Sequence, residues 1–235
     1  MKAIFLSIFL ILSCNASEKK ITFFDAANAV FSTYITNGKV DYAAIKKNPE
    51  KLENALQIAK NMQVSTDDPE LYKAFWINAY NLAVIKGIVN NYPIDSPMDQ
   101  KGFFDTITYE IGGQKTTLNN IENELLRAKF PEEARFHFVL VCAGLSCPPI
   151  IDNAYRPKTL EDQLQKQTEL SLNNPDFIKV NGNNVAVSMI FKWYKEDFEK
   201  KGGILKFINE FRDEKLPKNS DLSYYDYNWS LNDTK

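Results

Sequence analysis

One long helix dominates the pattern of the chain, beginning at Asp68-Pro69 and running to about Asn90. Asp68 suits the N-cap, and Pro69 suits the first helical position, where its missing amide hydrogen leaves no bond unmade. Tyr92-Pro93 stops the helix, because a residue that precedes proline avoids the helical conformation. Apolar residues at helical spacing form a stripe along one side. This stripe must be buried, so other elements are expected to pack on this helix.

Helices and strands follow one another along the chain without strict alternation. Helices are expected over residues 24–35, 41–62 with a break near 48–49, 119–129, 159–173, 191–198 and 204–211. Hairpins are expected over 105–111 with 114–118 and over 177–180 with 185–189, and single strands over 135–141 and 224–231. Asn119 with Glu122, and Thr159 with Asp162, have the pattern of helix-capping pairs. This order indicates an α+β fold of one domain, with helices packed on a small mixed or antiparallel sheet.

The charge balance excludes several classes of protein. The 235 residues include 28 Lys and Arg against 30 Asp and Glu, a formal net charge of −2. A protein that binds nucleic acid usually carries a basic excess, because phosphate contacts supply most of its affinity, so no nucleic-acid partner is expected. One histidine is too few for a His-rich metal site, and the sequence has no glycine-rich phosphate loop, GxSxG or HExxH motif. We therefore expect neither a metal nor a cofactor.

The N-terminus has the features of an export signal. Met1-Lys2 gives a positive start, and the apolar run over 3–12 is too short to span a bilayer. The residues Ile11-Leu12-Ser13-Cys14 at its end resemble the lipobox of bacterial lipoproteins. The resemblance implies that the Cys14 thiol receives a diacylglycerol, that the chain is cut before Cys14, and that the new amine is acylated. The alternative is an ordinary secretory signal whose cleavage site holds a cysteine.

These features divide the chain into a lipoprotein signal peptide over 1–13, a lipidated cysteine and tether over 14–20, and a domain over 21–235. Two or more acyl chains hold a protein stably on a membrane, whereas one chain binds marginally. The expected location is the cell envelope, with the chain anchored to a bacterial membrane and facing the periplasm or the exterior. The expected partner there is the lipid bilayer, through acylated Cys14.

The single histidine, His137, lies in the apolar segment 135–142. On the expected strand, alternation places His137 on one face with Val139 and Val141, and Cys142 on the other face. His137 and Cys142 then cannot meet without a bulge. A histidine among apolar residues is typically buried with its hydrogen bonds satisfied, which is the interpretation we favour. The alternative is a catalytic base.

Two cysteines besides Cys14 lie in the chain, Cys142 and Cys147. Outside the cytoplasm such a pair tends to form a disulfide, and a turn at Ala143-Gly144 would bring the two together. We favour this disulfide, or inert buried thiols. The same turn would let Cys147 approach His137, the minimum arrangement for a thiolate nucleophile. Two cysteines and one histidine leave a tetrahedral metal site one ligand short.

Two asparagines, Asn78 and Asn81, lie in or beside the apolar stripe of the long helix. Buried amides need hydrogen-bond partners, so we expect them to clamp the backbone of a neighbouring segment. The alternative is that one of them orients His137, as an asparagine does in papain-type sites. The aromatic residues of 191–198 and 225–232 are expected to pack in the core rather than to form a platform for a ligand.

Five ordered segments together resemble the DUF547 family, a domain of unknown function in bacteria and plants. They are AFWINAYN over 74–81, LNNIE over 118–122, HFVLVCAGLSCPP over 137–149, FKWYKEDF over 191–198 and DYNWSLN over 226–232. The resemblance covers about residues 65 to 232. It implies no reaction, because the activity of that family is not established.

Two classes of function fit these observations. The first is an envelope lipoprotein whose domain is a binding or scaffolding module for an unknown protein or small-molecule ligand. The second is a thiol-dependent hydrolase or transferase, with Cys147 as the nucleophile and His137 as the base. Asn78 or Asn81 would then orient the base or donate a hydrogen bond to an oxyanion. We favour the binding module, and whether the protein is an enzyme stays open.

Overall fold

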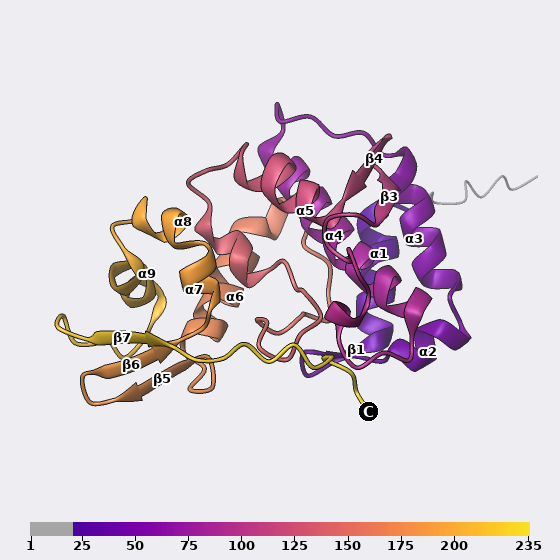
Figure 1. The fold of residues 1–235 in the computed structure, drawn as a ribbon. Coiled ribbons are helices and arrows are strands. Elements are labelled where there is room, and N and C mark those ends of the chain that lie inside the picture. Colours follow the sequence, from indigo (N-terminus) through magenta and orange to yellow (C-terminus); the bar gives the residue numbers. More distant parts are fainter. Residues whose placement is uncertain (1–20) are drawn as a thin grey trace, which may run out of the picture.

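The computed structural model describes residues 21–235, so the expected signal peptide over 1–13 and Cys14 lie outside the described residues. Helix α4, Pro69–Asn91, runs through the interior (Figure 1). Its N-cap is Asp68, whose side chain accepts a hydrogen bond from the amide of Leu71 at 3.1 Å. The side chains from Tyr72 to Val89 are buried almost without interruption. The expected long helix is therefore confirmed.

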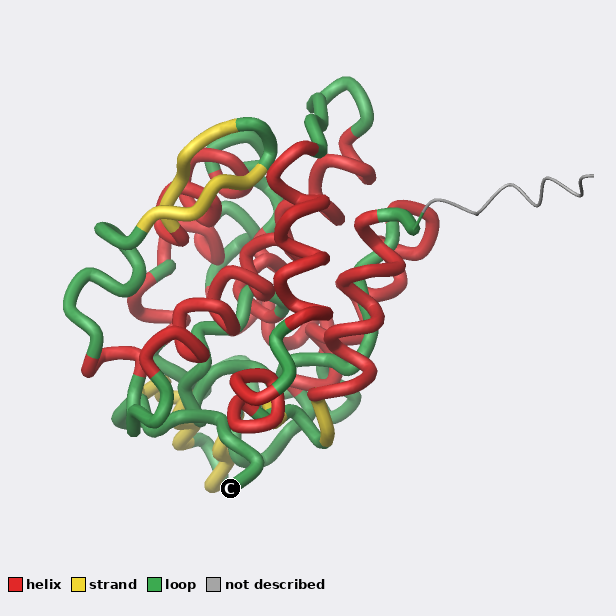
Figure 2. The backbone as a smooth tube through the Cα atoms, turned by 90° about the vertical axis from the view of Figure 1, so that its right-hand side faces the viewer, coloured by secondary structure: helices red, strands yellow, loops and turns green. Residues whose placement is uncertain are grey.

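Three earlier helices pack on α4 and on one another. They are α1 (Phe23–Tyr34), α2 (Tyr42–Lys47) and α3 (Glu50–Asn61). The expected helices over 24–35 and 41–62 are confirmed, including the break near 48–49. Figure 2 looks onto the side of the molecule that lies at the right of Figure 1, where helices form most of the face turned toward the viewer.

The strands pair in small sheets. Strands β1 (Ile35–Thr36) and β2 (Lys39–Val40) form one antiparallel pair, and β3 (Thr108–Ile111) and β4 (Gln114–Thr117) form another. In a third sheet, β5 (Ile178–Asn181) runs antiparallel to β6 (Asn184–Val187), which runs parallel to β7 (Asp221–Tyr224). Both expected hairpins are confirmed, and so is the α+β class with a small mixed sheet.

The buried apolar side chains form two clusters, and the segment over 134–139 and the helix over 160–172 contribute to both. The larger cluster surrounds α4, and the smaller one lies between the β5–β6–β7 sheet and the C-terminal helices. The two parts lie at the right and left of Figure 1. Phe136 belongs to the larger cluster and Phe138 to the smaller one. His137 is therefore held between the two cores.

The remaining elements complete the chain and place most of the residues discussed below. They are η1 (Pro97–Asp99), α5 (Leu118–Asn120), the π-helix η2 (Ile121–Arg127), the 3₁₀-helices η3 (Ala134–Phe138) and η4 (Pro157–Thr159), α6 (Leu160–Leu172), α7 (Ile190–Trp193), α8 (Lys195–Glu199) and α9 (Ile204–Phe211). The expected helix over 191–198 is thus two helices. The break between them is at Tyr194.

The expected strand over 135–141 is wrong. The segment forms the 3₁₀-helix η3, and the amide of Val139 donates to the carbonyl of Phe136 at 3.1 Å. Beyond η3, the side chain of Asn81 bonds the backbone of Val139 and Val141, so these groups need no neighbouring strand. Because the segment is not a strand, His137 and Cys142 do not lie on opposite faces of a sheet, and that prediction is wrong as well.

Two other boundaries also need correction. The expected strand over 224–231 is wrong because β7 ends at Tyr224, and the chain beyond it pairs only through isolated bridges, such as Gly144 with Leu231. The capping side chain before α5 is Thr117 rather than Asn119, since Thr117 Oγ1 accepts from the amide of Asn120 at 3.1 Å. Thr159 precedes α6, but its hydroxyl bonds the Gln163 side chain instead of a backbone amide.

The C-terminal segment ties the two parts together. It runs from β7 across the molecule toward β1, as the yellow strand and loop of Figure 1 show. Along this path the amide of Leu145 donates to the carbonyl of Ser230 at 2.8 Å, and the amide of Asn232 donates to the carbonyl of Ala143 at 2.9 Å. Within 21–235, none of the helices has the length and apolar character needed to cross a bilayer.

Candidate functional site

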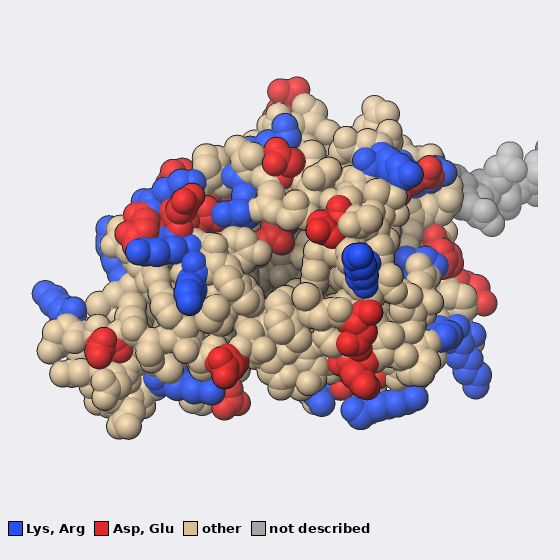
Figure 3. Space-filling model, in the orientation of Figure 1, with Lys and Arg blue, Asp and Glu red and all other residues tan. Residues whose placement is uncertain are grey.

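A cavity of about 210 Å³ opens where the two hydrophobic clusters meet. Six aromatic side chains line it, namely Tyr80, Phe104, Trp193, Tyr194, Tyr227 and Trp229. Its other wall residues are Asn119, Glu122, His137, Leu140, Cys142, Cys147 and Ile190. Figure 3 shows a hollow near the middle of the molecule, with mostly uncharged walls and acidic atoms at its edge.

The wall residues come from segments far apart in the sequence. Helix α4 supplies Tyr80, and the π-helix η2 supplies Glu122. The break between α7 and α8 places Tyr194 at the cavity, and the C-terminal segment brings Tyr227 and Trp229 back to it. The expectation that 191–198 and 225–232 serve only core packing is therefore incomplete, since their aromatic residues also wall this cavity.

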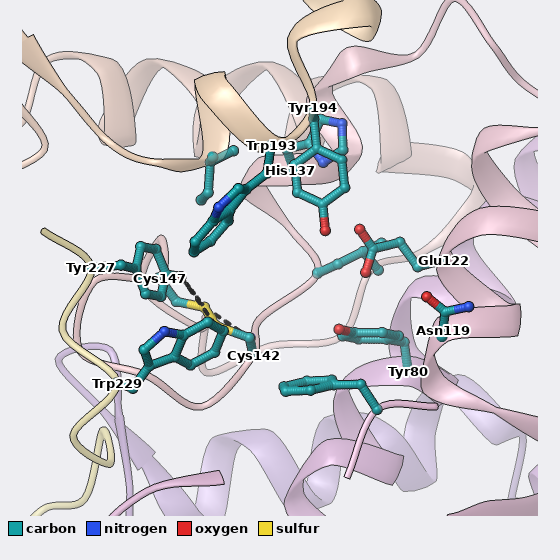
Figure 4. A pocket seen from close by; sticks show the side chains of 13 residues that line it. Tyr80, Asn119, Glu122, His137, Cys142, Cys147, Trp193, Tyr194, Tyr227 and Trp229 are labelled. Carbon is teal, nitrogen blue, oxygen red and sulfur yellow. Dashed lines mark hydrogen bonds between the residues drawn. A yellow bond between two sulfur atoms is a disulfide. The ribbon is translucent and has the colours of Figure 1, made fainter. Parts of the chain in front are cut away.

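Glu122 lies opposite two tyrosine hydroxyls. Figure 4 shows the hydroxyl group of Tyr194 directed toward the Glu122 carboxylate, and the ring of Tyr80 below that carboxylate with its hydroxyl end facing the cavity. Burial, followed by the negative charge of Glu122, raises the pKa of both Tyr80 and Tyr194 well above the ordinary value for tyrosine. Both hydroxyls therefore stay protonated and neutral at physiological pH. Among the residues described, no lysine or arginine lies within salt-bridge distance of Glu122.

His137 is fixed behind Tyr194 by a buried carboxylate. Its Nε2 atom lies 2.8 Å from Oδ2 of Asp197, and its ring stacks on that of Tyr194 with centroids 4.0 Å apart. Because a carboxylate only accepts hydrogen bonds, Nε2 carries the proton. Burial raises the pKa of Asp197, but the hydrogen bonds from His137 and Arg127 outweigh it and hold that pKa well below its ordinary value.

A disulfide joins Cys142 and Cys147 at the cavity wall, with their Cα atoms 6.2 Å apart. The Tyr227 hydroxyl lies 3.1 Å from each sulfur atom, as the dashed lines of Figure 4 show. The amide of Cys147 donates to the carbonyl of Gly144 at 3.1 Å. In this oxidised state Cys147 has no thiol. Its role as a nucleophile stays a prediction that concerns the reduced protein.

Asn78 and Asn81 clamp backbone segments. Asn81 Nδ2 donates to the carbonyl of Val139 at 2.9 Å, and its Oδ1 accepts from the amide of Val141 at 3.0 Å. Asn78 bonds both backbone groups of Tyr155 and also donates to the carbonyl of Ala74. Both donor hydrogens of Asn78 are therefore used.

The group that orients His137 is Asp197, which sequence reasoning did not select. Asp197 lies sixty residues along the chain from His137, and its carboxylate is one among 30 acidic side chains. Glu122 was likewise singled out in the sequence only as one residue of an expected helix-capping pair, with Asn119. Besides His137 and the two cysteines, the sequence signal for this region was the density of aromatic residues in 191–198 and 225–232. The described residues contain no group of three or more His, Cys, Asp or Glu side chains able to hold a metal ion.

Residues 64–170 match the model of a family described as "Protein of unknown function, DUF547". The match supports the resemblance for this segment, which contains Tyr80, Glu122, His137 and the disulfide. The segments over 191–198 and 226–232, which also carry the resemblance, lie outside the match. No curated protein and no solved structure matches the chain.

Proposed function

We propose that this protein is a binding protein of the bacterial envelope, anchored to the membrane through acylated Cys14, with the aromatic cavity as the site for a small-molecule ligand. One observation carries the ligand site. Six aromatic side chains from four separate parts of the chain converge on one cavity, together with a carboxylate and three tyrosine hydroxyls. Apolar walls with a few polar groups are the usual composition of a small-molecule site.

The wall is built to keep its shape. Trp193 stacks on Trp229 with centroids 5.9 Å apart, and Tyr227 contacts both rings at 4.8 and 4.7 Å. On the other side, His137 and Arg127 hold Tyr194, because Arg127 Cζ lies 4.8 Å from the Tyr194 ring centroid. Side chains that support one another in this way lose little freedom when a ligand binds, which favours affinity.

The second candidate is a thiol-dependent hydrolase or transferase. The observation in its favour is that His137 and Cys147 line the same cavity. Against it, the structure has Cys147 in a disulfide and Nε2 of His137 engaged with Asp197. The candidate therefore requires reduction of the disulfide before any reaction. Rapid alkylation of Cys147 in the native protein, slowed by His137→Ala, would support it.

The anchor is tested by expressing the full chain in a bacterium supplied with labelled palmitate. The wild type is expected to carry the label and to enter the detergent phase on partition. Cys14→Ser removes the acceptor thiol, so it is expected to lose both properties, while Cys142→Ser keeps them. A Cys14→Ser protein that still carries label and partitions with detergent would contradict the anchor.

The ligand site is tested with a library of small organic fragments, observed by ligand NMR. Fragments that bind the wild type are expected to lose their signal change in Trp193→Ala, whose side chain lines the cavity. Tyr224→Ala is the matched control, since Tyr224 is also an exposed aromatic residue but is not part of the cavity wall. The absence of any fragment whose binding depends on Trp193 would contradict the proposed site.

A further inference from the structure

We infer that the ligand of this cavity is a small organic cation, an ammonium ion carrying methyl groups, with Glu122 as its counter-ion. This inference rests on the proposed function and adds the chemical class of the ligand. Its basis is the combination of aromatic faces with a single carboxylate in one small cavity. Aromatic faces attract cations through their quadrupole, and they do so most strongly where water is excluded.

The charge of the wall favours a cation. Among the described residues that line the cavity, Glu122 is the one carboxylate, and neither lysine nor arginine is present. Arg127 lies nearby, but its Nε donates to Asp197 at 2.7 Å, and Lys200 also lies beside Asp197 at 3.7 Å. The charge of Glu122 contributes to the raised pKa of Arg127, but in the described part of the chain no ion pair joins Glu122 to either cation, so its carboxylate remains open to a ligand. An anion would meet that charge with no paired cation in the wall.

The tyrosines leave this charge balance unchanged. The hydroxyls of Tyr80 and Tyr194 stay protonated beside Glu122, because burial and that carboxylate raise their pKa. Glu122 is therefore the one acidic side chain in the described wall of the cavity. A positive charge on the ligand compensates this carboxylate, which lowers the cost of excluding water from the cavity.

The arrangement of the rings favours a methylated ammonium over a bare one. Figure 4 shows Trp193, Tyr227 and Trp229 on the side of the cavity opposite Glu122. A cation between them meets a carboxylate on one side and apolar ring surface on the other. Methyl groups pack against such surface, whereas a bare ammonium there would lose hydrogen bonds to water without replacement.

The size of the cavity limits the cation. At about 30 Å³ for each water molecule, 210 Å³ corresponds to about seven waters. A ligand of about seven non-hydrogen atoms therefore fills it. Choline is a probe of this size and charge. Its neutral counterpart, an alcohol in which carbon replaces the quaternary nitrogen, has the same shape without the charge.

The experiment is isothermal titration of the full chain, in a non-ionic detergent, with choline and with the neutral alcohol. Choline is expected to bind at least about tenfold more tightly, from its attraction to Glu122 and the ring faces. Glu122→Gln is expected to weaken choline about tenfold and to leave the alcohol unchanged. Glu124→Gln is the matched control, because Glu124 is an exposed carboxylate on the same π-helix outside the cavity.

A second variant tests the inference even if Glu122→Gln does not fold. Glu122→Asp keeps the charge, so it is expected to retain the preference for choline over the alcohol even where Glu122→Gln loses stability. Equal binding of choline and alcohol by the wild type, or no effect of Glu122→Gln in a folded protein, would overturn the inference.

The failure of this inference can be told from failure of the proposed function. If neither probe binds while fragments still bind in a Trp193-dependent manner, the cavity is a ligand site but not for a cation. If neither probe nor any fragment binds, both the inference and the proposed ligand site are wrong.

Discussion

His137 and Asp197 are joined through one oxygen atom, because Oδ2 of Asp197 lies 2.8 Å from Nε2 of His137 and also accepts from Nε of Arg127 at 2.7 Å. The contact links η3, which lies between the two cores, to α8 and η2. It also sets the position of Tyr194, whose ring packs against both His137 and Arg127. This carboxylate therefore supports one whole side of the cavity.

The first prediction concerns acid stability. Because the folded-state pKa of Asp197 is held below its ordinary value of 3.8, its contribution is fully present above about pH 5 and is lost as the pH falls through the folded-state pKa. Asp197→Asn is expected to lower the free energy of unfolding by about 2 kcal/mol at pH 7 and to flatten its fall below pH 5. Urea denaturation at stepped pH measures both.

The control for this prediction is Asp25→Asn. Asp25 has a lowered pKa from hydrogen bonds with Thr22 and Arg156, but its side chain is exposed at the surface. Replacing Asp25 is expected to change the fall of the free energy of unfolding at acid pH much less than Asp197→Asn does. If the two variants show the same dependence on pH, the role given to Asp197 is wrong.

The second prediction concerns the clamp at Asn81. Asn81→Leu keeps the size of the side chain but leaves the carbonyl of Val139 and the amide of Val141 without a partner in the core. We expect a loss of about 3 kcal/mol in the free energy of unfolding. Asn91→Leu removes one half-buried bond to the carbonyl of Gly87 and is expected to lose less than about 1 kcal/mol. Equal losses in the two variants would contradict the clamp.

The third prediction concerns the disulfide. In the loop-entropy description, closing so short a loop contributes about 2 kcal/mol, so the double variant Cys142→Ser/Cys147→Ser is expected to be less stable by that amount. The same variant removes the sulfur atoms beside the Tyr227 hydroxyl. Chemical denaturation gives the stability, and alkylation of the unfolded wild type before and after reduction gives the thiol count. Free thiols at both positions without reductant would contradict the disulfide and strengthen the thiol-dependent candidate.

Elements with local signals could be predicted from the sequence. Asp68-Pro69 marks the start of α4 and Tyr92-Pro93 marks its end, while Gly112-Gly113 marks the turn between β3 and β4. Each of these signals acts over a few neighbouring residues, so the local structure that it predicts does not depend on contacts with distant parts of the chain.

The segment over 135–141 could not be predicted in the same way. Its apolar and β-branched residues favour a strand, but Phe136 and Phe138 pack in different cores, and Asn81 bonds the backbone that follows. These contacts come from residues far along the chain and override the local preference.

The candidate site was predicted in part. The sequence drew attention to His137 and the two cysteines, and the structure places all three at one cavity. Glu122 and Tyr194 were missed as wall residues because each depends on a helix irregularity, a π-helix for Glu122 and a break between helices for Tyr194. Single-sequence patterns assume regular helices and do not show such irregularities.

The most direct test of the account is a crystal structure of the protein grown with choline. The account predicts that the quaternary nitrogen lies within about 6 Å of the centroids of Trp193 or Trp229, with its charge facing Glu122. A fully occupied choline at any other place, with the aromatic cavity filled only by water, would contradict it.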